Sequence, residues 1–436
     1  MFKRRREAFM KAMGQGVAVI PSAPLAHRTA DQDFTFRQDS DFYYMTGFKE
    51  PESVLVLAPQ HPEHQVIMFV RPRDKERETW DGRRSGTEGA LAQYGADAAY
   101  TIDQLEEILP RYLDNQSTLY FRIGRAAEWD ERILGMVQSY RTKARSGVTG
   151  PTTIADPAAI LHEMRLYKSP EEVDLMRRSA EIAAEAHVRA MRTTRPGMME
   201  YEVQAELEYV FKKRGAMGPA YGSIVGGGDN ATILHYGENE ARLNDGDLLL
   251  IDAGAEYEFY ASDITRTFPV NGRFSPAQRE IYELVLESQL EAISMSRPGV
   301  SFMAVHERTV EVLTAGLVRL GILKGQVPDL IESGAYKAFY MHKTGHWLGI
   351  DVHDVGAYKV NGEWRKLAPG MVTTVEPGLY IAHGTEGVDP KYWGIGVRIE
   401  DDVLITEDGC ENLTSGVPKA VDEIERLMAE SMTATR

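Results

Sequence analysis

The chain contains almost no cysteine, since Cys410 is the only one among its 436 residues. A single thiol excludes an intramolecular disulfide framework and is typical of a protein from a reducing compartment. The sequence also lacks any apolar run of the roughly 18 residues that a bilayer crossing requires. Its basic start, MFKRRREAFMKAM, is not followed by an apolar segment of signal-peptide length. We therefore expect a cytoplasmic protein with no membrane association.

Basic residues are also scarce relative to acidic ones. There are 49 Lys and Arg against 65 Asp and Glu, which gives a formal net charge of −16. Proteins that bind nucleic acid or anionic membranes generally need a basic surface, so both partners are excluded and peptides or small molecules are expected instead. With 43% hydrophobic residues, a chain of this length has ample material for two or three domains.

The first 150 residues alternate strand-like runs with helical patterns. The runs VAVIPS, SVLVLAP, QVIMFV and TLYFRI are separated by segments such as IDQLEEILPRYL, which predicts a mixed α/β domain. A Gly, Pro and Thr-rich stretch follows at 146–157. The next helix has a complete start signal, with Ser169 as N-cap, Pro170 as first residue and Glu172 as capping-box partner. We predict one domain over residues 1–160 and a second over 161–436.

The second domain contains a weak internal repeat. Arg195-Pro196-Gly197 lies between two helical patterns, and Arg297-Pro298-Gly299 does the same 102 residues later. A chance match of three residues is the alternative. A true duplication predicts a sheet covered by two related helix pairs, with a cleft between the halves.

Two aspartates lie inside an apolar, strand-like stretch, LLLIDAGAEYEFYASDITRTF at 248–268. A hairpin that turns at Tyr257 and Glu258 would place Asp252 directly opposite Asp263, with Cβ atoms roughly 4.5 to 5.5 Å apart. Such carboxylates repel and need a shared proton, a basic residue or a cation. A divalent metal is the strongest candidate, and a partly exposed hairpin with solvated acids is the alternative.

Three further segments carry potential metal ligands in similar settings. HKTGHWLGIDVHDVG contains His342, His346 and His353, while TTVEPGLYI and GIGVRIEDDVLIT each place one glutamate, Glu376 or Glu400, in a strand-like run. A donor set of four carboxylates and an imidazole suits Mn, Co, Fe or Zn, and four carboxylates suffice to bridge two ions. Two cations that share a water would make hydroxide available near neutral pH, which points to hydrolysis.

These segments resemble the signature of the pita-bread metallopeptidases, the family of methionine aminopeptidase, prolidase and the Xaa-Pro aminopeptidases. Three further segments extend the resemblance over essentially the whole chain: SDFYYMTGFKEPESVLVL, TWDGRRSG and PAYGSIVGGGDNATILHYGENE. The resemblance implies an α/β (α+β) chain, with an amino-terminal mixed α/β domain followed by a pseudo-twofold pita-bread catalytic domain. The implied activity is metal-dependent hydrolysis of the bond between an amino-terminal residue and a following proline in peptides.

The resemblance also assigns residues. The implied metal ligands are Asp252, Asp263, His346, Glu376 and Glu400, with Asp263 and Glu400 bridging two ions. The implied catalytic residues are His235, His353 and Glu376, the last as the proton acceptor. The residues implied in substrate binding or ligand orientation are His342, Tyr221, Trp80, Arg398 and Tyr380. Trp80 would reach the cleft from the amino-terminal domain across a subunit boundary.

The implied cofactor is a pair of divalent ions, most simply Mn²⁺, with Co²⁺ or Zn²⁺ as alternatives. The expected partners are proline-containing peptides and further copies of the chain in a homodimer or homotetramer. Two other functions remain open: a prolidase, which would bind the carboxylate of a dipeptide through Arg266, Arg398 or a neighbouring subunit, and a non-catalytic binding protein. One departure from the family pattern is Phe259, where relatives often have glycine.

Overall fold

A computed structural model describes residues 1–434 of the chain, which folds as two compact units, Met1–Met164 and Arg165–Arg436. Within residues 1–434 no helix combines the length and the apolar character needed to cross a bilayer. Each unit has its own hydrophobic core.

The amino-terminal unit is built on one mixed sheet of six strands in the order β4-β3-β2-β1-β5-β6. β1, β2 and β3 pair antiparallel, whereas β4, β5 and β6 join by parallel pairing. The strands are β1 (Val17–Pro21), β2 (Val54–Leu57), β3 (Val66–Val70), β4 (Ala98–Thr101), β5 (Thr118–Tyr120) and β6 (Thr153–Ala155). The helices are α1 (Phe2–Met13), α2 (Ser40–Thr46), α3 (Lys75–Asp81), α4 (Gly86–Tyr94), α5 (Leu105–Leu113), α6 (Ala127–Lys143) and α7 (Ala158–Leu166), the last running into the second unit. All four strand-like runs of the sequence are strands here.

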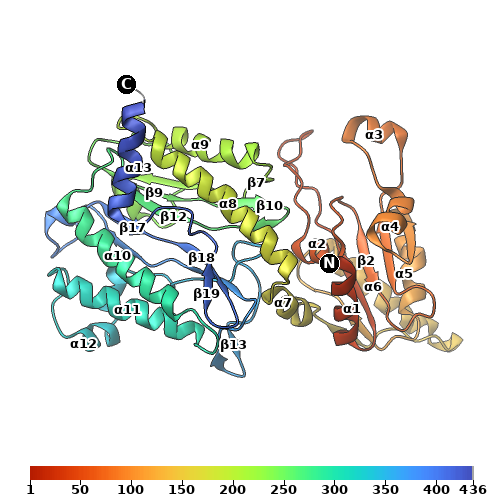
Figure 1. The fold of residues 1–436 in the computed structure, drawn as a ribbon. Helices are drawn as coiled ribbons and strands as arrows, with labels where there is room; N and C mark the ends of the chain where they lie inside the picture. The colour runs from red at the N-terminus through yellow and green to blue at the C-terminus, as the bar shows by residue number, and fades with distance from the viewer. Residues whose placement is uncertain (435–436) are drawn as a thin grey trace. The chain divides into compact units, whose positions relative to one another are not determined.

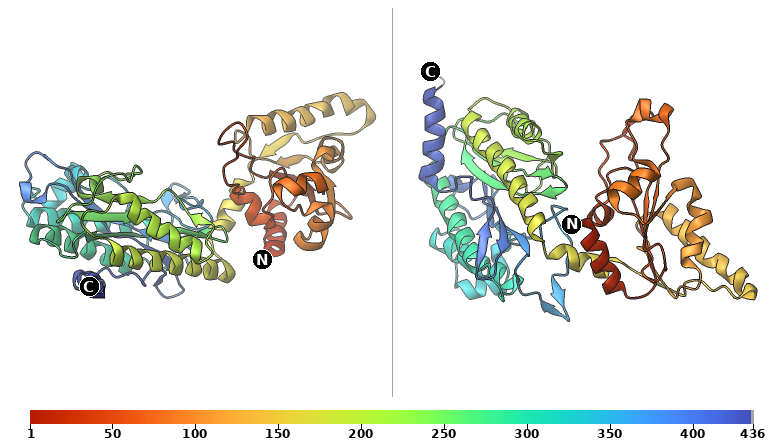
Figure 2. Two further views of the ribbon diagram at one scale, coloured as in Figure 1. Left: turned by 90° about the horizontal axis from the view of Figure 1, so that it is seen from above. Right: turned by 45° about the vertical axis from the view of Figure 1, so that its right-hand side comes forward.

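The carboxy-terminal unit consists of small antiparallel sheets packed together with its helices (Figures 1 and 2). Its helices are α8 (Pro170–Thr193), α9 (Glu200–Lys213), α10 (Pro276–Met295), α11 (Phe302–Arg319), α12 (Val327–Glu332) and α13 (Val421–Ala434). Its first-half strands are β7 (Gly218–Pro219), β8 (Ile224–Gly227), β9 (Leu248–Asp252), β10 (Ala255–Tyr257), β11 (Tyr260–Ala261) and β12 (Thr265–Pro269). Its second-half strands are β13 (Lys359–Val360), β14 (Glu363–Trp364), β15 (Val372–Val375), β16 (Gly378–Ile381), β17 (Ile395–Arg398), β18 (Asp401–Ile405) and β19 (Cys410–Asn412).

The start of α8 follows the sequence signal closely. Pro170 is its first residue, and the carboxylate of Glu172 accepts a hydrogen bond of 2.9 Å from the backbone N–H of Ser169. The other oxygen of Glu172 accepts a bond of 2.9 Å from the hydroxyl of Tyr260, so the same side chain also anchors the helix to β11.

The repeated Arg-Pro-Gly segment marks the same turn in each half. It connects α8 to α9 in the first half and α10 to α11 in the second, and its glycine has positive φ in both, 93° at Gly197 and 84° at Gly299. Each glycine donates its N–H to a leucine carbonyl that lies just before a sheet strand, Leu243 or Leu367. The two helix pairs therefore enter their halves in the same way, as a duplication predicts.

The predicted hairpin register is wrong by two residues. β9 pairs with β12 so that Asp252 faces Thr265 rather than Asp263. The turn occupies Glu258 and Phe259, both of which have positive φ (45° and 71°), as a two-residue turn of this twist requires. Phe259 thus adopts the backbone conformation that glycine favours. Side chains alternate along a strand, so Asp263 still shares a face with Asp252, as a diagonal neighbour.

Gly254 allows the two arms of this hairpin to approach. A Cβ at Gly254 would lie 1.7 Å from the carbonyl oxygen of Ser262, on the opposite arm. We expect Gly254→Ala to force the arms apart and to destabilise the carboxy-terminal unit by about 1–3 kcal/mol, measured by thermal unfolding. Gly218→Ala is the control, because β7 pairs with the same hairpin and a Cβ there has no atom within 4 Å. Equal melting temperatures for the two variants would contradict the prediction.

Candidate metal and peptide-binding site

The carboxy-terminal unit contains a cavity of about 690 Å³ that is lined by residues from both of its halves. The cavity wall includes ten of the residues singled out from the sequence: Tyr221, His235, Asp252, Asp263, His342, His346, His353, Glu376, Arg398 and Glu400. Tyr380 is buried and reaches the site through its hydroxyl, which is 2.8 Å from Nε2 of His342 and accepts a hydrogen bond of 3.0 Å from Arg398. Trp80 lies in the amino-terminal unit, on α3, where it is 83% exposed.

The acidic residues enter the cavity from strand ends in both halves. Asp252 is the last residue of β9, and Glu376 directly follows β15. Asp263 lies between β11 and β12, and Glu400 lies between β17 and β18. Residues at strand ends can turn their side chains toward a common space while the strands themselves stay packed in the core.

His346 is held with one ring nitrogen toward these carboxylates. Its Nδ1 lies 3.0 Å from the carbonyl oxygen of Trp347, and because a carbonyl only accepts, Nδ1 is the donor of this bond. Nε2 is then free to act as a ligand, and it lies 3.4 Å from Oδ2 of Asp263 and 3.5 Å from Oε1 of Glu376. Such a carbonyl contact is the usual way to fix the orientation of a metal-binding histidine.

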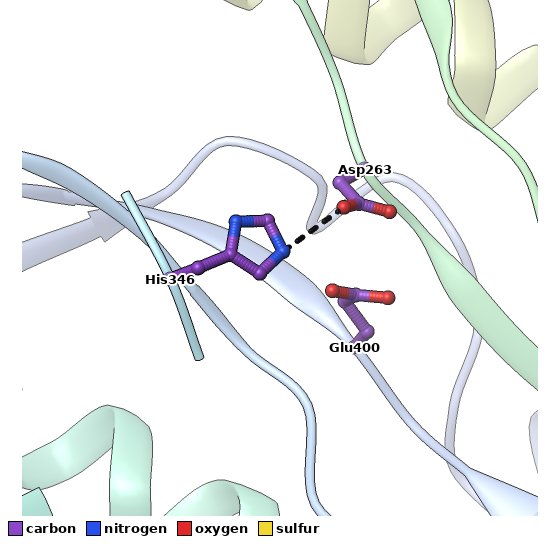
Figure 3. A group of neighbouring side chains, drawn as sticks. All are labelled: Asp263, His346 and Glu400. Carbon is purple, nitrogen blue, oxygen red and sulfur yellow. Dashed lines mark ion pairs between the residues drawn. The ribbon is translucent and has the colours of Figure 1, made fainter. Parts of the chain in front are cut away.

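Three of the predicted ligands already converge on one point. Asp263, His346 and Glu400 each offer a ligand atom, and these atoms all lie within 4.8 Å of one another (Figure 3). Asp252 is engaged elsewhere, since its two oxygens accept hydrogen bonds from the hydroxyl of Tyr221 at 2.6 Å and from Arg398 at 2.7 Å. The Tyr221 hydroxyl also contacts Asp263 closely.

Burial of these carboxylates disfavours their charged forms. It raises the pKa of Glu400 well above its ordinary value, with the neighbouring acids adding to the effect, and it raises the pKa of Glu376 to about 7. The pKa of Asp252 is raised for the same reason. For Asp263 burial acts in the same direction and is the largest single effect, but the nearby His346 ring, the Tyr221 hydroxyl and Arg398 together outweigh it and lower the pKa.

For His346 the surroundings favour the charged form instead. Burial alone would disfavour the imidazolium, yet the carboxylates of Asp263 and Glu376 raise the pKa of His346 to about 9. When all four are ionised, the carboxylates carry more negative charge than His346 and Arg398 can neutralise. A set of hard oxygen donors and one imidazole with this excess fits divalent metal ions.

Arg266 does not face this cavity. Its side chain is fully buried and donates to the backbone carbonyl of Glu400 at 2.6 Å, to that of Thr265 at 2.9 Å and to the carboxylate of Asp401 at 2.7 Å. Asp401 also accepts a hydrogen bond of 2.6 Å from Lys419. Arg266 thus ties the first-half strand β12 to the segment that carries Glu400, and it is no candidate for binding a substrate carboxylate.

The sequence did not reveal several residues of the site. Thr265 donates a hydrogen bond of 2.6 Å to Glu400, and His306, from α11, lines the cavity with Nδ1 2.9 Å from the hydroxyl of Thr344. Phe302 and Trp364 supply apolar wall. The one available signal was the position of α11 directly after the second Arg-Pro-Gly turn, which marks it as part of the second half.

Comparisons with known proteins agree with this geometry. A family model described as metallopeptidase family M24 matches residues 174–407, and one described as the amino-terminal domain of aminopeptidase P matches residues 2–120. The chain is 49% identical to Xaa-Pro aminopeptidase of Escherichia coli (strain K12), over 98% of this chain and 97% of that protein.

Solved structures are equally similar. Pseudomonas aeruginosa aminopeptidase PepP superposes with a TM-score of 0.98 at 54% identity, covering 99% of this chain and 98% of that one. Zinc-substituted E. coli aminopeptidase P in complex with product superposes with a TM-score of 0.96 at 48% identity, with the same coverage. The expected α/β fold class, with an amino-terminal domain and a pita-bread catalytic domain, is thereby confirmed.

The buried ion pair behind the cavity yields a stability prediction. Asp401→Asn would leave Arg266 and Lys419 without their carboxylate partner, and breaking a buried pair in this way costs about 3–5 kcal/mol. We expect a matching loss of stability of the carboxy-terminal unit in urea or thermal unfolding. Asp422→Asn is the control, because that side chain is 86% exposed and should change stability by less than about 0.5 kcal/mol. A loss no larger than that of the control would show that the pair is not structural.

Proposed function

The chain belongs to metallopeptidase family M24, and on this basis we propose that it is an Xaa-Pro aminopeptidase, which hydrolyses the bond between an amino-terminal residue and a following proline. One observation carries the proposal: the five potential metal ligands, scattered over 149 positions from 252 to 400, line a single cavity. No ligand position of the expected set is substituted, which argues against a binding protein that has lost its metals.

We propose that Asp252, Asp263, His346, Glu376 and Glu400 hold two divalent cations. The donor set fits Mn²⁺, which is the metal that we propose, and it would also accept Co²⁺ or Zn²⁺. The zinc-substituted form of E. coli aminopeptidase P supports this tolerance, since a protein 48% identical to this chain can hold zinc. When bound, the cations would activate a water and polarise the scissile carbonyl group.

The chain's own residues would carry the remaining steps. Glu376 would accept a proton from the attacking water and pass it to the leaving proline nitrogen. His235 and His353 line the cavity with exposed rings, from which an imidazole N–H can donate to the carbonyl oxygen as it becomes negative. The ring of His353 lies 4.3 Å from that of His346, which keeps this donor beside the metal ligands.

Substrate recognition would use the rest of the wall. The imidazole of His342, held by Tyr380, would contact the proline ring, with Tyr221 beside it. Asp252 would bind the free amino group of the substrate and so restrict cleavage to the first bond. Arg398 already donates to both Asp252 and Tyr380, so it orients these residues and is not available for a dipeptide carboxylate.

Assembly and location are part of the same proposal. The highly exposed Trp80 on α3 would complete the cleft of a neighbouring copy in a homodimer or homotetramer, and a light-scattering mass of a monomer would contradict this. A cytoplasmic location remains a prediction from the sequence.

Loss of one proposed metal ligand should weaken both metal binding and catalysis. We expect Glu400→Ala to lower kcat/KM for Xaa-Pro peptides by at least about 100-fold and to reduce the metal content below two ions per chain. Removal of a residue that only orients a metal ligand already lowers metal affinity or activity by about 10–100-fold, and removal of a ligand itself should cost more. Metal content would be measured after removal of metal and addition of Mn²⁺. Glu407→Ala is the control, since this glutamate is exposed in the loop after β18. Full activity of Glu400→Ala with added Mn²⁺ would refute the ligand assignment.

Substrate length separates the aminopeptidase from a prolidase. A dipeptidase must bind the carboxylate of the terminal proline, and neither Arg266 nor Arg398 is free to do so. We therefore expect hydrolysis of Ala-Pro-Ala at least as fast as that of Ala-Pro, and no cleavage of Ala-Ala-Ala. Activity confined to Ala-Pro would establish a prolidase instead.

A further inference from the structure

A buried glutamate outside the cavity accepts an unusual number of hydrogen bonds. Glu200, the first residue of α9, is 0% exposed, although carboxylates are seldom buried without compensation. Its oxygens face the segment 227–241, which runs from the end of β8 past His235.

Four donors in that segment hydrogen-bond to the carboxylate of Glu200. One oxygen accepts from the backbone N–H of Gly227 at 2.8 Å and from the side-chain amide of Asn230 at 3.0 Å. The other accepts from the hydroxyl of Tyr236 and from the backbone N–H of Ala241, both at 2.8 Å. A carboxylate has about four acceptor sites, so Glu200 is saturated by a single stretch of chain.

The exposed His235 lies at the centre of this stretch. Its neighbour Tyr236 is buried against Leu250 and Tyr380, so its ring and its hydroxyl fix the backbone next to His235. Asn239 adds a second attachment to α9, because its side-chain amide donates to Gln204 at 2.9 Å. The side chain of His235 is thus exposed, while the backbone that carries it is held in place by buried contacts of its neighbours.

We propose that Glu200 is the positioning residue for His235, holding the segment 227–241 so that the imidazole faces the scissile carbonyl. This inference rests on the proposed role of His235 and extends it to a residue that does not touch the substrate. The metal ligands lie on other segments, so the contribution of Glu200 is separate from metal binding.

Glu200→Gln tests the proposal directly. An amide replaces one acceptor oxygen with an N–H₂ group, so two of the four bonds are lost and a donor faces the donors that remain. We expect kcat to fall by about 10–100-fold, by analogy with the loss found when a residue that orients a metal ligand is removed, while two metal ions per chain are retained. Tyr236→Phe, which removes one donor and keeps the ring, should give a smaller loss, and it serves as the test if Glu200→Gln does not fold.

A double-mutant cycle with His235→Ala distinguishes positioning from general stabilisation. If Glu200 acts through His235, Glu200→Gln should change kcat by no more than about twofold in the His235→Ala background. Glu202→Gln is the matched control, since this exposed glutamate caps α9 through the N–H of Met199 and does not contact the segment.

An equal loss from Glu200→Gln with and without His235 would overturn the inference, as would a loss of bound metal or full wild-type activity in Glu200→Gln. Full activity of His235→Ala would instead refute the proposed role of His235 itself. The two failures are therefore distinguishable.

Discussion

Mutual repulsion among four carboxylates, two of them buried and two half-buried, is the constraint on which the carboxy-terminal unit depends. Asp252, Asp263, Glu376 and Glu400 share one cavity with His346, the proposed imidazole ligand, and with the guanidinium of Arg398. In the unfolded chain these acids would be far apart and hydrated. Folding must therefore supply the free energy that brings them together. Two divalent cations would return that free energy on binding, which couples the stability of the unit to its cofactor.

Hydroxyl donors and ion pairs elsewhere in the unit offset this repulsion. Hydroxyl groups of Tyr221 and Thr265 donate to the carboxylates within the cavity, and Arg398 neutralises one of them. Behind the cavity, the side chain of Arg266 in the first half donates to the backbone carbonyl of Glu400 and to the carboxylate of Asp401 in the second half. The duplicated architecture serves the same end, since each half delivers its acids from the ends of rigid strands.

Much of the fold and the donor set could be predicted from the sequence because the signals were local. The start of α8 at Pro170, the strands of the first unit and the acids in apolar runs needed only short windows of sequence. The hairpin register failed because Glu258 and Phe259 are unusual residues for positive φ, so the turn lay one residue later than composition suggested. The place of Arg266 could not be predicted either, because its partner is 135 residues away and only tertiary packing brings them together.

The distribution of the ligands along the chain has a consequence for biosynthesis. The first proposed ligand is Asp252, but Glu400 and Lys419, the second cation on Asp401, are added much later in translation. A nascent chain that stops short of Glu400 lacks one of the proposed ligands and cannot build the proposed site. Peptidase activity can therefore arise only after both halves of the unit have been synthesised. Chains truncated before that point would be inactive.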